Sequence, residues 1–200
     1  MNNIDKFYTS DAKKFSSNYL NYLKQVIDGL DTGQIANFIQ ILVEAREEGR
    51  TIFFIGNGGS AATSSHFAND ISIGINDYEK PFKAVSLADN LPIITALGND
   101  FGYEEIFYRQ LKVMGKKNDV LVSISASGNS PNLLKAVEYA KSIGIITVGI
   151  TAFDGGKLKQ ESDHGIHVQT ERGEYGPAED VHMIMDHLIG AYLMRFVKNA

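Results

Sequence analysis

The sequence predicts an α/β protein in which helices cover both faces of a parallel sheet. Five short apolar segments have the length and β-branched content of buried strands, and helical periodicity fills the stretches between them. A purely helical region precedes the first strand. Strands that alternate with helices form parallel sheets, because right-handed crossovers return the chain to the same end of the sheet.

The first 48 residues predict a pair of helices, with a break at 29–33. Apolar residues recur there at helical spacing. They are Tyr8, Phe15, Tyr19, Leu23 and Ile27 in the first helix, and Ile35, Phe38, Ile39, Leu42 and Val43 in the second. The aromatic stripe of the first helix needs an apolar surface to cover it. The helices of the sheet or another subunit can supply that surface, and the sequence leaves both open.

The chain from residue 51 onward predicts the sheet and its covering helices. Strands are expected at 51–56, 82–87, 119–125, 145–151 and 165–169. Helices are expected at 60–72, 90–98, 103–113, 131–143 and 178–198. No internal repeat or linker marks a second domain, so we expect a single domain over 1–200. The helical pair occupies 1–48 and the α/β core 49–200.

Composition excludes several classes of protein. The 200 residues carry a formal net charge of −5, and the basic clusters are only pairs, so a nucleic-acid partner is not expected. No apolar run approaches the ~20 residues of a membrane span. The chain has no cysteine, so it has neither disulfides nor a thiolate metal site. The first residues do not resemble a secretory signal, and the expected location is the cytoplasm.

Two glycine- and serine-rich turns, each at the end of a predicted strand, carry the chemistry. The first is Gly56-Asn57-Gly58-Gly59-Ser60 and the second is Ser125-Ala126-Ser127-Gly128-Asn129-Ser130. Each turn opens a helix, whose free N–H groups and partial positive charge favour an anion. Glycines allow close approach and serine hydroxyls add donors. Two such turns in one small protein predict a phosphorylated small-molecule ligand.

Two other interpretations of these turns explain less. The first turn with Ala61 fits a loose dinucleotide fingerprint, but the nearest acidic candidate, Asp89, lies about 30 residues on rather than about 20. That interpretation also leaves the second turn without a role. A purely structural role explains the glycines, but it does not explain four serines together: Ser60, Ser125, Ser127 and Ser130.

Histidines and carboxylates on two helices are candidates for acid–base or metal chemistry. His66 and Asp70 are four residues apart and share a helix face, either as a functional pair or as a solvated one. The last helix carries Glu179, Asp180, His182, Asp186 and His187. Glu179 and Asp180 also suit a helix N-terminus, and His182 is expected to be exposed. If both are helical, Glu179 and His187 are ~12 Å apart, so one metal holds both only if Glu179 precedes the helix or the two come from different subunits.

At these residues the chain resembles the sugar isomerase (SIS) domain family, and within it the phosphoheptose isomerases. The likeness covers about residues 35 to 195. It rests on the two turns, on His66-Phe67-Ala68, on Gly98-Asn99-Asp100-Phe101-Gly102, on 151–157 and on Glu179-Asp180-Val181-His182 with His187. The resemblance implies a three-layer αβα sandwich with a five-stranded parallel sheet of flavodoxin-like type. It also implies a homotetramer with active sites between subunits, one zinc ion per subunit, and isomerisation of sedoheptulose 7-phosphate to a heptose 7-phosphate.

The resemblance also assigns roles to individual residues. The substrate-binding positions are Asn57, Gly58, Gly59, Ser60, Asn99, Asp100, Ser125, Ala126, Ser127, Ser130 and Glu179. The metal positions are His66, Asp70, Glu179 and His187, with Asp70 and His187 as the catalytic acid–base pair. Asp70 stands where the family has glutamate, Glu179 where it has glutamine, and Ala126 where threonine is common. The alternative is a non-catalytic protein that binds sugar phosphates and acts through protein contacts; a carboxylate and a histidine facing the sugar favour the enzyme.

Overall fold

Five parallel strands form one sheet, as the sequence predicted, and their order in the sheet is β2-β1-β3-β4-β5. The computed structural model describes residues 1–199. The strands are β1 Thr51–Gly56, β2 Lys83–Ser86, β3 Val120–Ser125, β4 Ile146–Ala152 and β5 His164–Val168. Alternate side chains of each strand enter different cores: Phe54 of β1 faces one side of the sheet and Phe53 the other.

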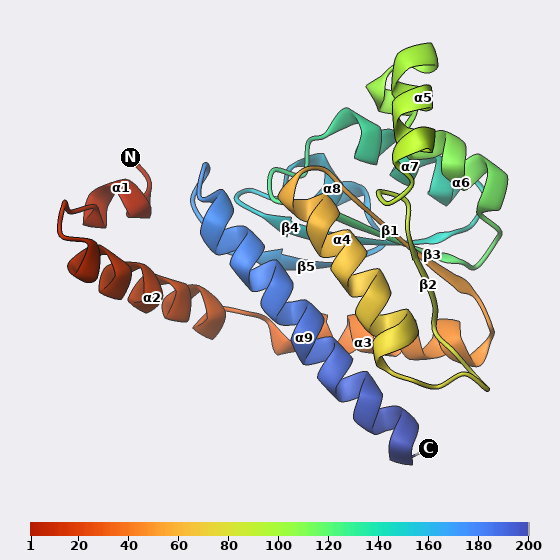
Figure 1. The fold of residues 1–200 in the computed structure, drawn as a ribbon, viewed down its shortest axis with the longest axis horizontal. Coiled ribbons are helices and arrows are strands. Elements are labelled where there is room, and N and C mark those ends of the chain that lie inside the picture. Colours follow the sequence, from red (N-terminus) through yellow and green to blue (C-terminus); the bar gives the residue numbers. More distant parts are fainter. Residues whose placement is uncertain (200) are drawn as a thin grey trace.

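Helices cover both faces of the sheet, which gives the predicted three layers (Figure 1). One face carries α3 Thr32–Glu47, α4 Gly59–Asn69 and α9 Tyr175–Asn199. The other carries α6 Tyr108–Met114, α7 Pro131–Ser142 and α8 Gly156–Glu161. Helix α5 Leu91–Phe101 buries none of its residues and projects from the body. No helix among residues 1–199 combines the length and the apolar character that a bilayer span requires.

Local sequence signals explain most of the helix ends. Asp31 caps α3 by accepting from the N–H groups of Gly33 and Gln34, and Pro131 opens α7 at the position where a proline loses no helical hydrogen bond. Helix α8 was missed, because six residues are too few to display a helical period. The last helix starts at Tyr175 rather than 178, so Glu179 lies within it.

The N-terminal region contains three helices rather than the predicted two: α1 Asn3–Phe7, α2 Ala12–Asp28 and α3. Helix α3 packs on the sheet of its own chain, whereas α2 buries only Val26. The buried Glu174 carboxylate holds this region to the segment before α9, since it accepts hydrogen bonds from the Asn3 backbone and the Tyr22 hydroxyl. Of the predicted aromatic stripe, Phe15 and Tyr19 of α2 are half-buried, whereas Tyr8, which ends α1, is exposed. Leu20 of α2 is exposed as well.

The strand order places the two glycine- and serine-rich turns side by side. Strands β1 and β3 are neighbours, with Gly56 paired to Ile124, while β2 lies on the far side of β1. The chain therefore leaves β1 in one direction and later returns to its other side, which makes the carboxyl ends of β1 and β3 a topological switch point. Ligands of open α/β sheets bind in the crevice that such a switch point creates.

Candidate functional site

The first turn leads directly into α4. Gly58 has a φ of 55°, and α4 begins at Gly59 with Ser60 buried in its first turn. The carboxylate of Glu179 lies against Gly59 so closely that a Cβ there would meet its oxygens at 2.3 and 2.5 Å. Glycine at this position therefore lets α9 bring a carboxylate to the N-terminus of α4. Burial, and then the nearby Asp180, raises the pKa of Glu179 above its usual range.

The second turn is held in shape by its own side chains. The Ser125 hydroxyl accepts a hydrogen bond from the Gly128 N–H at 3.1 Å, and the Asn129 amide donates to the Ser127 carbonyl at 2.9 Å. Gly128 has a φ of 63°, and a Cβ there would lie 1.9 Å from the Gly155 carbonyl, so only glycine fits. Ser130 occupies the N-cap of α7, and its side chain makes no capping bond. Its hydroxyl is thus available to a ligand.

A reciprocal pair of asparagines joins the two turns. Asn57 and Asn132 each donate an amide hydrogen to the other's carbonyl oxygen, both at 2.9 Å. The Tyr103 hydroxyl also donates to the Asn57 oxygen at 2.9 Å. Asn132 is 2% exposed and was not among the predicted site residues. Its position one residue after Pro131 carried no separate sequence signal, because the partner is 75 residues away.

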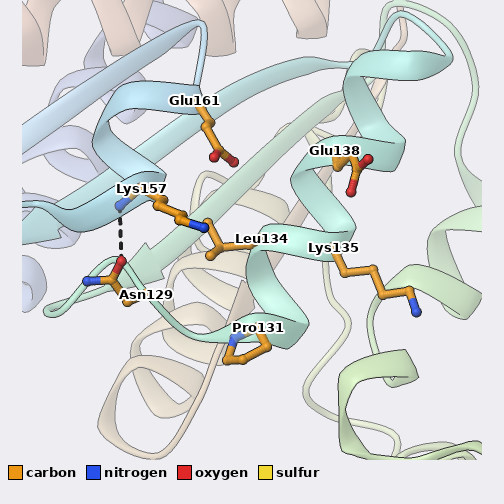
Figure 2. A pocket seen from close by; sticks show the side chains of 7 residues that line it. All are labelled: Asn129, Pro131, Leu134, Lys135, Glu138, Lys157 and Glu161. Atoms are coloured by element: carbon orange, nitrogen blue, oxygen red, sulfur yellow. Dashed lines mark hydrogen bonds between the residues drawn. The ribbon is translucent and has the colours of Figure 1, made fainter.

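A groove of about 840 Å³ lies beside the second turn, between α7 and α8 (Figure 2). Asn129 at its end accepts a hydrogen bond from the Lys157 backbone at 3.2 Å. Two cations and two anions line the groove, namely Lys135, Lys157, Glu138 and Glu161. The histidines and aspartates of the candidate catalytic cluster lie elsewhere, on α4 and α9.

That cluster consists of His66, Asp70, Asp186 and His187, whose ligand atoms all lie within 4.8 Å of one another. The Nε2 atom of His66 is 3.2 Å from Nε2 of His187 and 3.4 Å from Oδ2 of Asp70. The predicted common face of His66 and Asp70 is confirmed by that second distance. Asp70 ends α4 and starts a π-turn over Asp70–Gly74, an irregularity common at functional sites.

Asp186 is the member of the cluster that the sequence did not assign to the site. Its side chain is fully buried, Oδ2 lies 3.8 Å from His66 Nε2, and neither carboxylate oxygen has a hydrogen-bond partner. Burial raises the pKa of Asp186 to about 7; the Asp70 carboxylate adds to the rise and His66 opposes it. The available signal was its place in the apolar stripe of α9, between Met185 and the buried Ile189.

The donor set of the cluster suits a divalent transition metal such as zinc. Imidazole nitrogens and carboxylate oxygens bind zinc at about 2.0–2.2 Å, so neighbouring donors around a tetrahedral ion lie roughly 3.4 Å apart. The separations from His66 Nε2, at 3.2, 3.4 and 3.8 Å, match that spacing. The buried Asp186 carboxylate accepts no hydrogen bond, and a bound cation would offset the cost of burying it.

Other predicted site residues lie outside this cluster. Glu179 stands two turns before His187 on α9, beside the first turn, and does not join the ligand group that one chain forms. Asn99 and Asp100 lie exposed near the end of α5, where Asn99 donates to the Asp100 carboxylate. The expectation that His182 is exposed was wrong: its side chain is fully buried, because it lies on the face of α9 that packs on the sheet.

Comparison with known proteins identifies the family. The family model of the SIS domain matches residues 14–152, more than half of the chain. The chain belongs to the SIS domain family. Its αβα sheet and its two turns at the switch point are thus those of a SIS domain.

Curated relatives and solved structures of this SIS domain protein include phosphoheptose isomerases. The phosphoheptose isomerase of Helicobacter pylori strain Shi470 is 38% identical over 161 residues, which cover 80% of this chain and 83% of the relative. That of Clostridium acetobutylicum is 36% identical over 162 residues, covering 81% and 82%. The structure of the Neisseria gonorrhoeae phosphoheptose isomerase aligns with a TM-score of 0.80 and 26% identity, covering 90% of this chain and 97% of that one.

Proposed function

We propose that this SIS domain protein is a phosphoheptose isomerase, which converts sedoheptulose 7-phosphate to D-glycero-D-manno-heptose 7-phosphate. The observation that carries the proposal is the arrangement along α4. An anion-binding turn lies at its start and the His–Asp cluster near its end. Ser60 and His66 are separated by about 9 Å of helical rise, comparable to the length of an extended seven-carbon sugar phosphate. The phosphoheptose isomerases among the relatives support the same substrate class.

Aldose–ketose isomerisation moves one proton between C1 and C2 and another between the two oxygens. We assign the carbon-bound proton to Asp70, a carboxylate at the rim of the cluster, and the oxygen-bound proton to His187. An enediolate forms between the two transfers, and no covalent attachment to the protein is needed. Both side chains are accessible to a ligand, since His187 is exposed and Asp70 is about one-third exposed.

The two turns bind the substrate in this proposal. Hydroxyls of Ser60, Ser125, Ser127 and Ser130, with the N–H groups that open α4 and α7, hold the phosphate. The remaining predicted contacts to the sugar are Asn57, Gly58, Gly59, Ala126, Asn99, Asp100 and Glu179. The Asn57–Asn132 pair fixes the spacing of the turns and therefore the position of the phosphate relative to the acid–base pair.

We propose one zinc ion per subunit, bound by His66, Asp70 and His187. When bound, zinc polarises the substrate carbonyl and stabilises the negative charge that develops on its oxygen. The resemblance implies Glu179 as the fourth ligand. Within one chain, about 12 Å of helix separates Glu179 from His187, which is too far for one ion to bind both. A Glu179 that binds this ion would therefore belong to another subunit.

We propose a homotetramer in the cytoplasm. Exposed apolar side chains support the assembly: Leu91 of α5 is 67% exposed, Leu20 of α2 64% and Tyr192 of α9 51%. An apolar groove of about 500 Å³ between α5 and α6 adds to this surface. A second copy of the chain would cover it. Sedimentation of a single-copy particle at micromolar concentration would contradict the assembly and any active site shared between subunits.

The deciding experiment is incubation of the purified protein with sedoheptulose 7-phosphate, followed by detection of the aldose product. Phosphorylated pentoses and hexoses serve as substrate controls, and unphosphorylated sedoheptulose tests the role of the turns. We expect turnover of sedoheptulose 7-phosphate and no turnover of the control sugars. Binding without turnover of any of these sugars would favour the non-catalytic alternative.

A further inference from the structure

Tyr103 is an exposed residue at the candidate site to which the proposed function gives no role. The residue is 58% exposed, yet its hydroxyl lies 2.9 Å from the side-chain oxygen of Asn57 in the first turn. It follows directly on the projecting helix α5, which carries Asn99 and Asp100 near its end (Figure 1). Because Tyr103 touches the first turn and remains open to solvent, it borders the space that a sugar bound at that turn would occupy.

The hydrogen bonds around Asn57 have a defined direction. A backbone N–H can only donate, so the Leu133 N–H, 3.1 Å from Oδ1 of Asn132, identifies that atom as the amide oxygen. The amide nitrogen of Asn132 therefore donates to the Asn57 oxygen at 2.9 Å. The Tyr103 hydroxyl meets the same Asn57 oxygen, which has no hydrogen to give. Tyr103 is therefore the donor in this contact.

This direction decides what Tyr103 can still bind. A phenol hydroxyl carries one hydrogen, and Tyr103 uses it on Asn57. Its remaining lone pairs can accept a hydrogen bond, but the hydroxyl has no second hydrogen to donate. An ionised phosphate and a ketose carbonyl present acceptor oxygens only, so neither is a partner for these lone pairs. A sugar hydroxyl is a partner, because it can donate.

The backbone around Tyr103 is held in a fixed place. Gly102 has a φ of 99°, a conformation that favours glycine, and it lets the chain turn from α5 into the short 3₁₀ helix Tyr103–Glu105. The Glu105 carboxylate ends this turn and accepts hydrogen bonds from Arg109 at 2.9 Å and from Lys135 at 2.5 Å. Lys135 belongs to α7, the helix that follows the second turn. The tyrosine is thus anchored to the body of the protein rather than to the projecting helix alone.

We propose that Tyr103 is a sugar-binding residue, whose hydroxyl oxygen accepts a hydrogen bond from a substrate hydroxyl near the phosphorylated end of the sugar. The inference rests on the proposed function, since it requires the phosphate at the turns. It adds a contact at a residue that neither the motifs nor the resemblance assigned to the site. Through this contact the site distinguishes a sugar phosphate from phosphate alone.

The test compares binding of sedoheptulose 7-phosphate with binding of inorganic phosphate by calorimetry. In Tyr103→Phe the ring is kept and the hydroxyl is lost. Affinity for the sugar phosphate should fall roughly 2–10-fold, as expected for one neutral hydrogen bond. Affinity for inorganic phosphate should stay within about twofold of wild type, because the amide pair of Asn57 and Asn132 still joins the turns.

Monodeoxy analogues of the substrate, lacking the hydroxyl at C5 or at C6, separate a sugar contact from a structural role. One of the two should bind wild type and Tyr103→Phe equally well, because it lacks the hydroxyl that Tyr103 accepts from. The matched control is Tyr78→Phe. Tyr78 is 68% exposed and precedes β2, at the opposite end of the sheet from the turns, so this variant should keep both wild-type affinities.

Equal weakening of sugar phosphate and inorganic phosphate in Tyr103→Phe would overturn the inference and make Tyr103 a support of the first turn. An unchanged affinity for the sugar phosphate would also overturn it, and wild-type turnover would then leave the proposed function intact. If wild type binds inorganic phosphate but no phosphorylated sugar, the proposed function and the inference both fail.

Discussion

Replacement of Asn132 by alanine tests whether the side-chain bridge between the turns positions the phosphate. The change removes both 2.9 Å hydrogen bonds to Asn57, and also the 3.1 Å hydrogen bond that the Leu133 N–H donates to the side-chain oxygen Oδ1 of Asn132. Each net hydrogen bond contributes about 0.5–1.5 kcal/mol, and an orphaned buried donor costs about 1–3 kcal/mol. Because Asn57 is half-buried, water replaces part of the loss. We expect about 2–3 kcal/mol of lost stability.

The same change should affect substrate binding more than the chemical step. Without Asn132, the Asn57 oxygen keeps only the hydrogen bond from Tyr103. The first turn then moves more freely relative to the second, so the phosphate contacts weaken in ground state and transition state alike. Such uniform weakening raises KM and leaves kcat nearly unchanged. A loss of about 1.4 kcal/mol corresponds to a tenfold rise in KM.

Steady-state kinetics with sedoheptulose 7-phosphate and thermal unfolding provide the two measurements. For a chain of this size, 2–3 kcal/mol corresponds to a fall in melting temperature of roughly 5–10 °C. Asn132→Asp is the matched variant, because it keeps the size and one acceptor but loses the donor and sets a carboxylate against the Asn57 oxygen. A KM within twofold of wild type in both variants would refute the reasoning. It would mean that the pairing of β1 and β3 alone fixes the turns.

Three further predictions follow from the site and its burial. Asp70→Asn should lower turnover by several orders of magnitude with little change in phosphate binding, since the amide keeps the shape but accepts no proton; wild-type kcat would move the base role to His187. Ser127→Ala should weaken inorganic phosphate binding by about 1–3 kcal/mol in a calorimetric titration, and an unchanged Kd would place the phosphate elsewhere. Burial lowers the pKa of His182 from 6.5 to about 4, so between these values only the unfolded chain takes up the proton. The free energy of unfolding should therefore fall as pH drops from about 6.5 to 4, by at most about 3 kcal/mol. His182→Leu should flatten this part of the stability profile in denaturant titrations; an unchanged profile would contradict the assignment to His182.

The sequence by itself determined the elements whose signals are local. The apolar runs of β1 and β3 and the turns that follow them could be predicted, because strand patterning and turn chemistry act within a few residues. The parallel direction of the strands followed from their alternation with helices, whereas the order of the strands in the sheet was seen only in the structure. The pairing of His66 with Asp70 was equally predictable, since a four-residue spacing on one helix fixes their common face.

Only the tertiary structure decided which distant side chains meet. The contact between His66 and His187 spans 121 residues, and that between Asn57 and Asn132 spans 75. The start of α9 at Tyr175 fixed Glu179 inside the helix and beside Gly59, away from the His–Asp cluster. The packing of α9 on α4 buried Asp186 among the cluster's donors. The position of Glu179 and the burial of Asp186 do not follow from helix periodicity. Periodicity specifies which face of a helix is apolar, but not the depth and register at which two helices pack.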